Sequence, residues 1–452
     1  MCRAHIFSHF QPMRYIGSAS AAHFGKPSAR FRVINALALK LAPAQSRIVC
    51  KKVEKVKRTV LLLVLSTAAL AVNASFAQST IKIGEINSYK AQPAFLEPYK
   101  KGWELAQDEI NKVGIGGKKI ETIFRDDNAN PGDAVRVAEE LVTREKVALI
   151  SGTFLSNIGL AVGDFAKLRK VLFIASEPLS DKLTWGNGNE YTYRLRASTT
   201  MQTTMLVPEA AKLNKKRWGI VYPNYEYGQS AAAAFKRLLI SAQPSGGVEF
   251  VELASPLGKI DAGSVAQALI DAKVDAIFNV TFGADLQKFV REGNTRGLFK
   301  DRPVVSLLSG EPEYLDTLKD ETPTGWLVTG YPWEQINTPE HKAFRDAYVA
   351  KYNDHPRLGS VVGYATMKSI AAMLEKSGST ETAKMQAAMK NLVVESPFGK
   401  ITWRAQDNQS TMGAYVGRLA QKDGKGVMTG WRYVDGKDVQ PTDEEVKRLR
   451  PQ

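Results

Sequence analysis

The sequence predicts an α/β protein with two lobes of similar build. Short apolar runs of strand length alternate with amphipathic segments of helical length from residue 81 onward. Such an alternation is typical of parallel sheets covered by helices on both faces. It ends near residue 197 and begins again near residue 217, with no long linker between the two blocks. The length of 452 residues, with 44% hydrophobic and 24% charged residues, suits one to three globular domains.

The first block contains five strand-like runs. They are residues 81–86, 118–127, 147–151, 171–176 and 191–197. The helical segments between them have apolar residues near helical spacing: they cover residues 97–113, a stretch opened by Pro131, and a stretch that begins near Asn157. Proline is favoured in the first turn of a helix, which supports the second of these assignments.

The second block repeats the pattern and then changes character. Its strand-like runs are residues 217–223, 248–253, 274–282, 302–308 and 325–333. Its predicted helices are 199–213, 228–242, 263–273, 283–296, 338–353, 358–377 and 380–392. Three short strands with Gly-rich turns follow (GKITWRA, GAYVGRLAQ and WRYVDG), and residues 443–452 are predicted to be a polar tail.

Residues 1–77 are predicted to be a leader with a secretory signal peptide. Basic residues precede a 13-residue apolar run (VLLLVLSTAALAV, 60–72), and Ser75-Phe76-Ala77 supplies small residues for cleavage after Ala77. The run is shorter than the roughly 20 apolar residues of a membrane span, although an uncleaved anchor is the alternative. A leader of this length is unusual, and we expect that residues 1–50 are not translated. Export of the mature chain to the periplasm is the expectation.

The positive charge belongs largely to this leader. The whole chain has a formal net charge of +15, but residues 1–77 hold 12 of the 61 Lys and Arg residues and one of the 46 Asp and Glu residues. The remaining chain therefore carries a net charge of +4, which argues against a nucleic-acid partner. Both cysteines, Cys2 and Cys50, also lie in the leader, so the mature chain has no disulfide or thiolate site.

The mature chain lacks the motifs of common enzymes. We find no P-loop, nucleophile elbow or zincin motif. Asp126, Asn128, Asn130 and Gly132 imitate part of a calcium loop, but the required Gly and Glu positions hold Pro131 and Val137. His341 and His355 stand in polar sequence and are expected to be solvated. We therefore predict no catalytic residues, no metal, no cofactor and no enzymatic activity.

A polar corner follows the strand at residues 147–151. Ser156 and Asn157 stand where the next helix begins, and a helix N-terminus can bind a carboxylate through free N–H groups and its dipole. Alternatively, Ser156 or Asn157 serves only as the N-cap of that helix. The sequence leaves both roles open.

Other strand ends of the two blocks carry aromatic and acidic residues. In open α/β sheets, ligands bind beyond the carboxyl ends of the strands. The residues at these positions are Glu177, Tyr225, Tyr227, Phe282 and Glu311. The aromatic rings can close over a ligand or merely pack between strand and helix, and the carboxylates can meet an ammonium or hydroxyl group or remain in solvent.

An ordered set of segments resembles the leucine/isoleucine/valine-type periplasmic binding proteins of ABC importers. It includes IKIGEI, DEINKVGIGGKKIETIFRDDNANPGDAVRVAEELV, VALISGTFLSN, RWGIVYPNYEYGQS, DAIFNVTFGADLQKFV and SPFGKITWRAQDNQS. The resemblance implies two Rossmann-like lobes joined by three crossings near residues 194–200, 325–334 and 398–405. It assigns residues 78–197 with 334–397 to the N-terminal lobe and 198–333 with 398–442 to the C-terminal lobe.

The same resemblance implies roles for several residues. Ser156 and nearby backbone N–H groups would hold a ligand carboxylate. Aromatic contacts would come from Tyr227, Phe282 and Phe95, and Glu311 would bind an amino group. The first loop departs from the family pattern by carrying Tyr89, and ASEPLS (175–180) replaces an A-A-T-like stretch. The chain thus resembles the branch that binds aromatic carboxylates.

We therefore expect a monomeric periplasmic receptor that captures a small organic acid and delivers it to an ABC permease. Three alternatives remain open. The chain is a binder of branched-chain amino acids or amides, a ligand sensor that docks on a signalling partner, or an enzyme with machinery that the motifs do not reveal.

Overall fold

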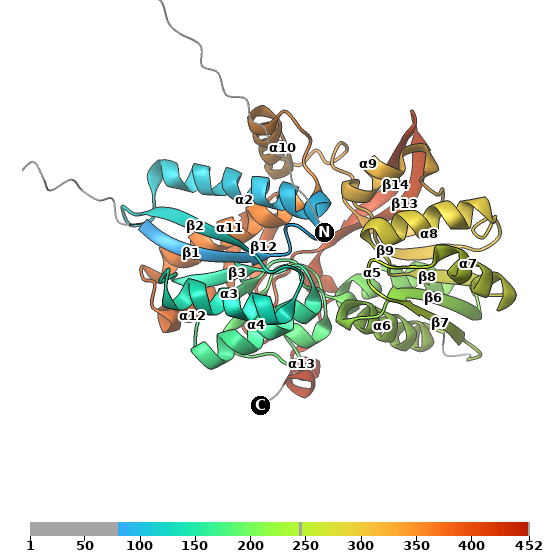
Figure 1. Cartoon of the computed structure of the whole chain (residues 1–452), viewed down its shortest axis with the longest axis horizontal. Helices are drawn as coiled ribbons and strands as arrows, with labels where there is room; N and C mark the ends of the chain where they lie inside the picture. Colours follow the sequence, from blue (N-terminus) through green and yellow to red (C-terminus); the bar gives the residue numbers. More distant parts are fainter. Residues whose placement is uncertain (1–79, 244–245, 451–452) are drawn as a thin grey trace, which may run out of the picture. The chain divides into compact units, whose positions relative to one another are not determined.

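The computed structural model describes residues 80–243 and 246–450 (Figure 1). The signal peptide, the cleavage after Ala77 and the untranslated stretch expected at residues 1–50 lie outside the described residues. Within the described ranges, no helix is long and apolar enough to cross a membrane.

The first lobe is built on a five-stranded parallel sheet with the order β2-β1-β3-β4-β5. Its strands are β1 (Thr80–Asn87), β2 (Lys119–Asp126), β3 (Leu149–Gly152), β4 (Phe173–Ala175) and β5 (Thr192–Arg194). The connecting helices are α2 (Pro93–Val113), α3 (Pro131–Thr143) and α4 (Ser156–Arg169). Every residue of β3 and β4 is buried, as expected for strands covered by helices on both faces.

The second lobe is built on a seven-stranded sheet with the order β14-β13-β10-β9-β8-β6-β7. Its strands are β6 (Arg217–Pro223), β7 (Glu249–Ser255), β8 (Ala276–Asn279), β9 (Val304–Gly310), β10 (Leu327–Gly330), β13 (Ala414–Lys422) and β14 (Lys425–Val434). Its helices are α5 (Thr199–Lys212), α6 (Glu226–Ala242), α7 (Ala262–Asp271), α8 (Gly283–Thr295) and α9 (Pro312–Leu318). Strands β6 to β10 pair in parallel, whereas β13 and β14 add antiparallel strands at one edge.

Three helices and a small hairpin return to the first lobe. They are α10 (Pro339–Tyr352), α11 (Leu358–Ser377), α12 (Thr382–Met389) and the antiparallel pair β11 (Leu392–Ser396) and β12 (Gly399–Trp403). Helix α11 packs along α2 at very short range: a Cβ added at Gly363 would lie 2.0 Å from the backbone oxygen of Tyr99. Glycine is needed there because any side chain would meet the backbone of the other helix.

Three crossings join the lobes, at residues 195–198, 331–338 and 404–413. The first and third run side by side, because Arg194 donates its backbone N–H to the carbonyl of Asn408 and accepts one from Ser410. The second and third crossings lie later than the predicted 325–334 and 398–405, because residues 327–330 form β10 and residues 399–403 pair with β11.

Strand β11 occupies a position at the end of a predicted helix. Helix α12 ends at Met389, and Asn391 has a left-handed backbone (φ 52°), which turns the chain into β11. The strand alternates buried and exposed residues, a period that a helix cannot satisfy. The helix predicted over 380–392 is therefore too long.

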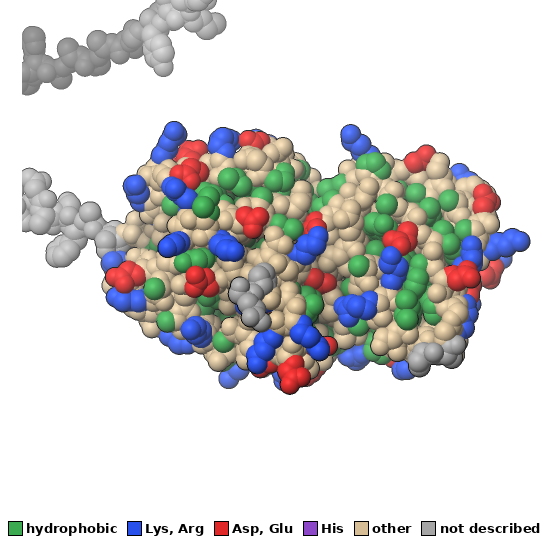
Figure 2. Space-filling model, turned by 90° about the horizontal axis from the view of Figure 1, so that it is seen from below, with side chains coloured by type: hydrophobic (Ala, Val, Ile, Leu, Met, Phe, Trp, Pro, Cys, Tyr) green, Lys and Arg blue, Asp and Glu red, His purple; other side chains and the backbone are tan. Residues whose placement is uncertain are grey.

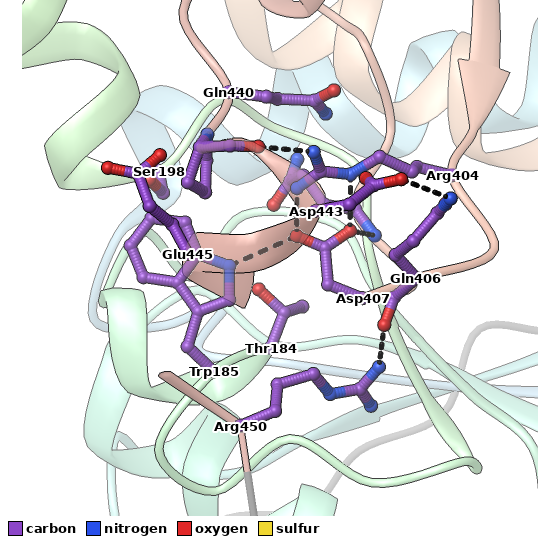
Figure 3. A network of polar contacts seen from close by, with 12 residues as sticks. Thr184, Trp185, Ser198, Arg404, Gln406, Asp407, Gln440, Asp443, Glu445 and Arg450 are labelled. Carbon is purple, nitrogen blue, oxygen red and sulfur yellow. Dashed lines mark hydrogen bonds and ion pairs between the residues drawn. The ribbon is translucent and has the colours of Figure 1, made fainter. Parts of the chain in front are cut away.

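Residues 443–449, predicted to be part of a polar tail, form helix α13 (Asp443–Leu449). Thr442 and Glu445 make a capping box, and Val446 is buried. Figure 3 shows how this helix is tied to the third crossing: Gln406 donates to Asp443, and Arg450 donates to the carbonyl of Gln406. In the same network the buried Asp407 accepts hydrogen bonds from Arg404 and from the indole of Trp185.

The surface carries charge of both signs. On the face shown in Figure 2, Lys and Arg side chains are interspersed with Asp and Glu. This face lacks the continuous basic stripe expected where a nucleic acid binds.

Candidate functional site

The candidate site is a small pocket where the carboxyl ends of the strands of both sheets face one another. It is lined by Phe95, Phe154, Ser156, Glu177, Leu179, Arg196, Tyr225, Tyr227, Phe282, Leu308 and Tyr314. The first lobe contributes residues from the loops after β3 and β4 and from the first turns of α2 and α4. The second lobe contributes residues from the loops after β6 and β8, from α6, β9 and α9, and Arg196 lies in the first crossing. The pocket encloses about 20 Å³, room for about one water molecule. A larger guest therefore enters only if the walls move apart.

Aromatic rings from both lobes form most of the pocket wall. Phe95 and Phe154 of the first lobe lie 5.2 Å apart between ring centroids, and Phe154 reaches Phe282 of the second lobe at 6.1 Å. Tyr227 lies 5.8 Å from Phe282 and 6.1 Å from Tyr225. Tilted and edge-on contacts at these distances are favourable for aromatic pairs. The wall is thus suited to hold a flat apolar ring.

Ser156 lies at the first turn of α4 but does not cap it. The N-cap is Leu155, which has no side-chain capping bond, so the predicted N-cap role of Ser156 or Asn157 is wrong. Instead, the Oγ of Ser156 accepts the backbone N–H groups of Leu179 and Ser180, each at 3.2 Å. A hydroxyl has two acceptor positions and one hydrogen, so the hydrogen of Ser156 remains available to a ligand oxygen.

Arg196, which sequence reasoning missed, is the central charged residue of the site. Its guanidinium donates to Glu177 Oε2 at 3.0 Å and to Glu311 Oε1 at 2.7 Å, and it lies 5.6 Å from the centroid of the Phe95 ring. All three charged side chains are buried. Two of the five N–H donors of the guanidinium are bound by carboxylates, which also offset its positive charge and so reduce its attraction for an anionic ligand.

Burial shifts the pKa of these carboxyl groups upward. It raises the pKa of Glu177 to about 8 and that of Glu311 to about 7, although Arg196 opposes both shifts. The nearby Glu313 has a pKa raised to about 8 by burial and by the charge of Glu311. One guanidinium cannot balance three buried carboxylates, so the cluster retains protons near neutral pH.

Two buried polar atoms on the pocket wall have no hydrogen-bond partner among the described residues. They are Glu177 Oε1 and the hydroxyl of Tyr227. Burial raises the pKa of Tyr227 well above 10, so its hydroxyl keeps its hydrogen. Both atoms can therefore bond to a polar group of a ligand.

The structure brings together most of the predicted site residues. Phe95, Ser156, Glu177, Tyr225, Tyr227 and Phe282 line the pocket. Glu311 lies in an adjacent cavity and reaches the pocket through Arg196. Asn157 does not line the pocket, and neither does Tyr89, whose hydroxyl donates to Glu85 and whose ring packs against Phe124.

Besides Arg196, the prediction omitted Phe154, Leu179, Leu308 and Tyr314. Phe154 stands in the polar corner next to Ser156, and its large apolar side chain in a strand-end loop was a usable signal. Arg196 lies within a predicted crossing. A cationic residue directly after a buried strand was a weaker signal than the strand-end loop position of Phe154.

No group of three metal-binding side chains occurs within residues 80–243 and 246–450. His341 is buried rather than solvated, contrary to the prediction. Its ring bonds to the hydroxyl of Tyr331 at 2.6 Å and to the carbonyl of Ile336, and burial lowers its pKa to about 4. His355 is partly exposed and stacks on Trp333.

Comparisons with known proteins match this architecture. Residues 80–425 match the family model described as periplasmic binding protein. The chain is 27% identical over 385 residues to Leu/Ile/Val-binding protein homolog 7 of Brucella suis, covering 80% of this chain and 94% of that protein. It is 24% identical to the leucine-, isoleucine-, valine-, threonine- and alanine-binding protein of Pseudomonas aeruginosa, covering 72% and 86%.

Solved structures show the same fold. The solute-binding protein of an ABC transporter from Rhodopseudomonas palustris BisB5, in complex with 3,4-dihydroxybenzoic acid, is 25% identical with a TM-score of 0.72, covering 81% of this chain and 99% of that chain. A second, from Rhodopseudomonas palustris HaA2 in complex with p-hydroxybenzoic acid, is 23% identical with a TM-score of 0.71, covering 82% and 100%.

Proposed function

The chain belongs to the periplasmic binding protein family, and we propose that it captures an aromatic carboxylate and delivers it to the permease of an ABC importer. The observation that carries the proposal is the pocket between the lobes, where aromatic rings from both sides surround a serine hydroxyl at a helix N-terminus. The aromatic wall suits the ring, and the hydroxyl suits the carboxylate.

The carboxylate is held by Ser156 and the first turn of α4. Ser156 begins this 14-residue helix, so the free N–H groups and the positive end of the helix dipole lie beside it. Such a site binds an anion without a cationic side chain. This fits the geometry of Arg196, whose two ends are bound to Glu177 and Glu311.

Binding is coupled to movement of the lobes. The pocket volume of about 20 Å³ is far below the roughly 300 Å³ at the lower end of ordinary ligand sites. The ligand therefore enters an open form, and the lobes close around it by rotation at the three crossings. The closed form is the one that docks on the permease. No step alters the ligand, so the protein acts as a receptor and not as an enzyme.

An amino-acid ligand is the second candidate. It is favoured by the relatives named for leucine, isoleucine and valine binding and by the surplus of buried carboxylates around Arg196, which could balance an ammonium group. The aromatic wall favours the first candidate, because a branched-chain side chain does not need six aromatic rings around it.

A ligand panel tests the proposal. Purified protein is heated with benzoate, hydroxybenzoates, leucine, urea or a neutral sugar. The right ligand at a hundredfold excess over Kd is expected to add about 2.7 kcal/mol to the free energy of unfolding. Stabilisation by the sugar alone would contradict the carboxylate assignment, and stabilisation by leucine alone would favour the second candidate.

Replacing the serine tests the anchor. Ser156→Ala removes the hydroxyl hydrogen, so the affinity for the carboxylate is expected to fall by about 1–3 kcal/mol in isothermal titration. Ser151→Ala is the matched control, because Ser151 is equally buried in β3 but donates to the carbonyl of Ile174 instead of lining the pocket. An unchanged affinity in Ser156→Ala would leave Ser156 only its bonds to Leu179 and Ser180.

The proposal includes export, a monomeric state and a permease partner. The apolar run at residues 60–72 and the small residues before Gln78 support cleavage after Ala77. N-terminal sequencing of periplasmic protein is expected to begin at Gln78, and light scattering is expected to give the mass of one chain. Crosslinking to an inner-membrane permease, rather than to a signalling receptor, separates transport from sensing.

A further inference from the structure

Three buried carboxyl groups meet between the lobes, and a single cation serves them. Glu177 follows β4 of the first lobe, whereas Glu311 and Glu313 follow β9 of the second lobe. Arg196, in the first crossing, donates to Glu177 at 3.0 Å and to Glu311 at 2.7 Å. Among the described residues, no other cationic side chain lies within ion-pair distance of the three carboxyl groups. If all three were ionised, three negative charges would face one positive charge.

Each carboxyl group of this cluster has one oxygen without a hydrogen-bond partner. The unpartnered atoms are Glu177 Oε1, Glu311 Oε2 and Glu313 Oε2, all of them buried. The other oxygen of Glu313 accepts the backbone N–H of Gly359, on the first lobe, at 2.8 Å. A buried charge that lacks partners is costly, whereas a carboxyl group that holds a proton has no charge to balance. The contacts therefore favour a cluster in which at least one carboxyl group is protonated.

The other groups that face the cluster do not supply the missing positive charge. They are tyrosine hydroxyl groups on neighbouring elements, and burial raises the pKa of each above its ordinary value of 10, so they stay neutral. These residues are Tyr99, Tyr227, Tyr314, Tyr331 and Tyr348. A water molecule in the adjacent cavity of about 20 Å³ would donate to an oxygen of Glu311 but would leave its charge in place.

Closure of the lobes assembles this cluster. Opening would separate Glu177 from Glu311 and Glu313 and would admit water, and both changes return the carboxyl groups toward their ordinary pKa of 4.5. In the closed form, burial raises the pKa of Glu177 and Glu313 to about 8 and that of Glu311 to about 7. The closed form therefore holds a proton over a pH range in which the open form has released it.

We infer that the protein binds its carboxylate ligand together with a proton, which the cluster of Glu177, Glu311 and Glu313 takes up from solvent as the lobes close. The inference rests on the proposed function and adds the regulation of the same site by pH. The anionic ligand brings a further negative charge into the enclosed region, which strengthens the uptake. The proton moves from solvent to a carboxylate oxygen, and the ligand itself is unchanged.

The affinity for the carboxylate is therefore expected to fall as the pH rises. The open form releases the proton above its ordinary pKa of 4.5, while the closed form keeps it until the pH reaches about 7 to 8. Between these limits, the uptake of one proton changes the affinity by about tenfold per pH unit. We expect the affinity for benzoate to fall about 10- to 100-fold between about pH 5.5 and 7.5.

Isothermal titration in two buffers at one pH tests the inference. Phosphate and imidazole release very different heats when they give up a proton, so the difference between the observed enthalpies counts the protons taken up per ligand. With benzoate or 4-hydroxybenzoate at pH 7, we expect an uptake of about one proton.

Two variants locate the proton. Glu177→Gln and Glu313→Gln each remove an ionisable group and keep an oxygen that can accept from Arg196 or from Gly359, and each is expected to lower the uptake. Glu85→Gln is the matched control, because Glu85 is also buried with its pKa raised to about 8 but bonds to Asn87 and Tyr89 within the first lobe.

The outcomes separate the inference from the proposed function. Binding of benzoate without proton uptake would overturn the inference and leave the aromatic carboxylate receptor intact. Uptake that is unchanged in both cluster variants, or that falls in Glu85→Gln, would also overturn it. Failure of both aromatic carboxylates to bind, with leucine bound instead, would overturn both, because the ammonium group of leucine would take the place of the proton. Uptake that falls in either cluster variant, with the control unchanged, supports the inference.

Discussion

Glu85 shows at the scale of a single residue how burial makes stability depend on pH. Its carboxyl group is fully buried and accepts hydrogen bonds from Asn87 and Tyr89. Burial raises its pKa from 4.5 to about 8. Between pH 4.5 and 8, the folded protein therefore holds a proton that the unfolded protein has released. The stability that this proton contributes is complete below about pH 4.5 and is lost as the pH rises through 8.

Glu85→Gln is expected to flatten this dependence. The amide is neutral at every pH, so the free energy of unfolding should fall less steeply between pH 5 and 8 than in the unmodified protein. Urea titrations at several pH values measure it, with the exposed Glu121→Gln as control. The flattening is partial, because Glu177, Glu311 and Glu313 have raised pKa values as well. Parallel curves for the two proteins would contradict the assignment.

Residue positions at strand ends were predictable, but the partners of charged residues were not. Ser156, Tyr227 and Phe282 follow strands whose apolar pattern is clear in the sequence, and parallel strands bring their carboxyl ends to one edge. Arg196 becomes significant only through Glu311, which is 115 residues away in the chain. The N-cap prediction failed for a related reason: Ser156 has better partners in the loop after β4.

At the scale of elements, the contact between α2 and α11 depends on the absence of side chains. A Cβ at Gly363 would lie 2.0 Å from the carbonyl oxygen of Tyr99, a backbone atom that cannot turn away. Gly363→Ala is therefore expected to push the helices apart and to lower the free energy of unfolding by about 1–3 kcal/mol.

Thermal or urea unfolding measures this effect. Gly186→Ala is the control, because a Cβ there would come no closer than 3.7 Å to any neighbour. Equal midpoints for Gly363→Ala and the unmodified protein would mean that the helices can separate at no cost.

Elements with strong local patterns were predictable, and those that depend on a distant partner were not. The strands of the two main sheets have apolar runs that identify them. Strand β11 forms because it pairs with β12, a partner that its own five residues do not identify. Helix α13 did carry a local signal: Thr442 followed three residues later by Glu445 is a capping box pattern. Its polar composition concealed that signal.

At the scale of the whole molecule, the lobes are held together by bonds outside the pocket. Glu226, at the start of α6 in the second lobe, accepts the hydroxyl of Ser180 at 2.7 Å and the ammonium of Lys182 at 2.8 Å, both from the first lobe. Glu313 accepts the backbone N–H of Gly359 in the same way at 2.8 Å. These bonds stabilise the closed form. They therefore raise the affinity for a ligand that is bound with the lobes closed.

Glu226→Ala is expected to weaken ligand binding about fivefold without removing a pocket residue. The partly buried hydrogen bond from Ser180 and the exposed ion pair with Lys182 together contribute about 1 kcal/mol to closure, and their loss shifts the population toward the open form. Titration gives the affinity, and small-angle scattering gives the radius of gyration. Glu209→Ala is the control, because Glu209 pairs with Lys212 within one helix. An unchanged affinity would show that these bonds do not help to close the lobes.

The two-lobe organisation was predictable because the strand and helix pattern stops and restarts along the chain. The resemblance to the leucine/isoleucine/valine-type family implied three crossings, and the second and third lie later in the chain than expected. The degree of closure was not predictable, because it depends on bonds between residues such as Ser180 and Glu226 that no local pattern connects.

The contact between α2 and α11 also governs when the first lobe can fold. Helix α2 begins at residue 93, but the helix that covers its apolar face begins at residue 358, and Asp108 bonds to Lys351 across 243 positions. A chain that is synthesised from its N-terminus must therefore grow by more than 250 residues before the apolar face of α2 is covered. Contacts of such long sequence separation form slowly. The first lobe can therefore complete its fold only after most of the chain has been synthesised.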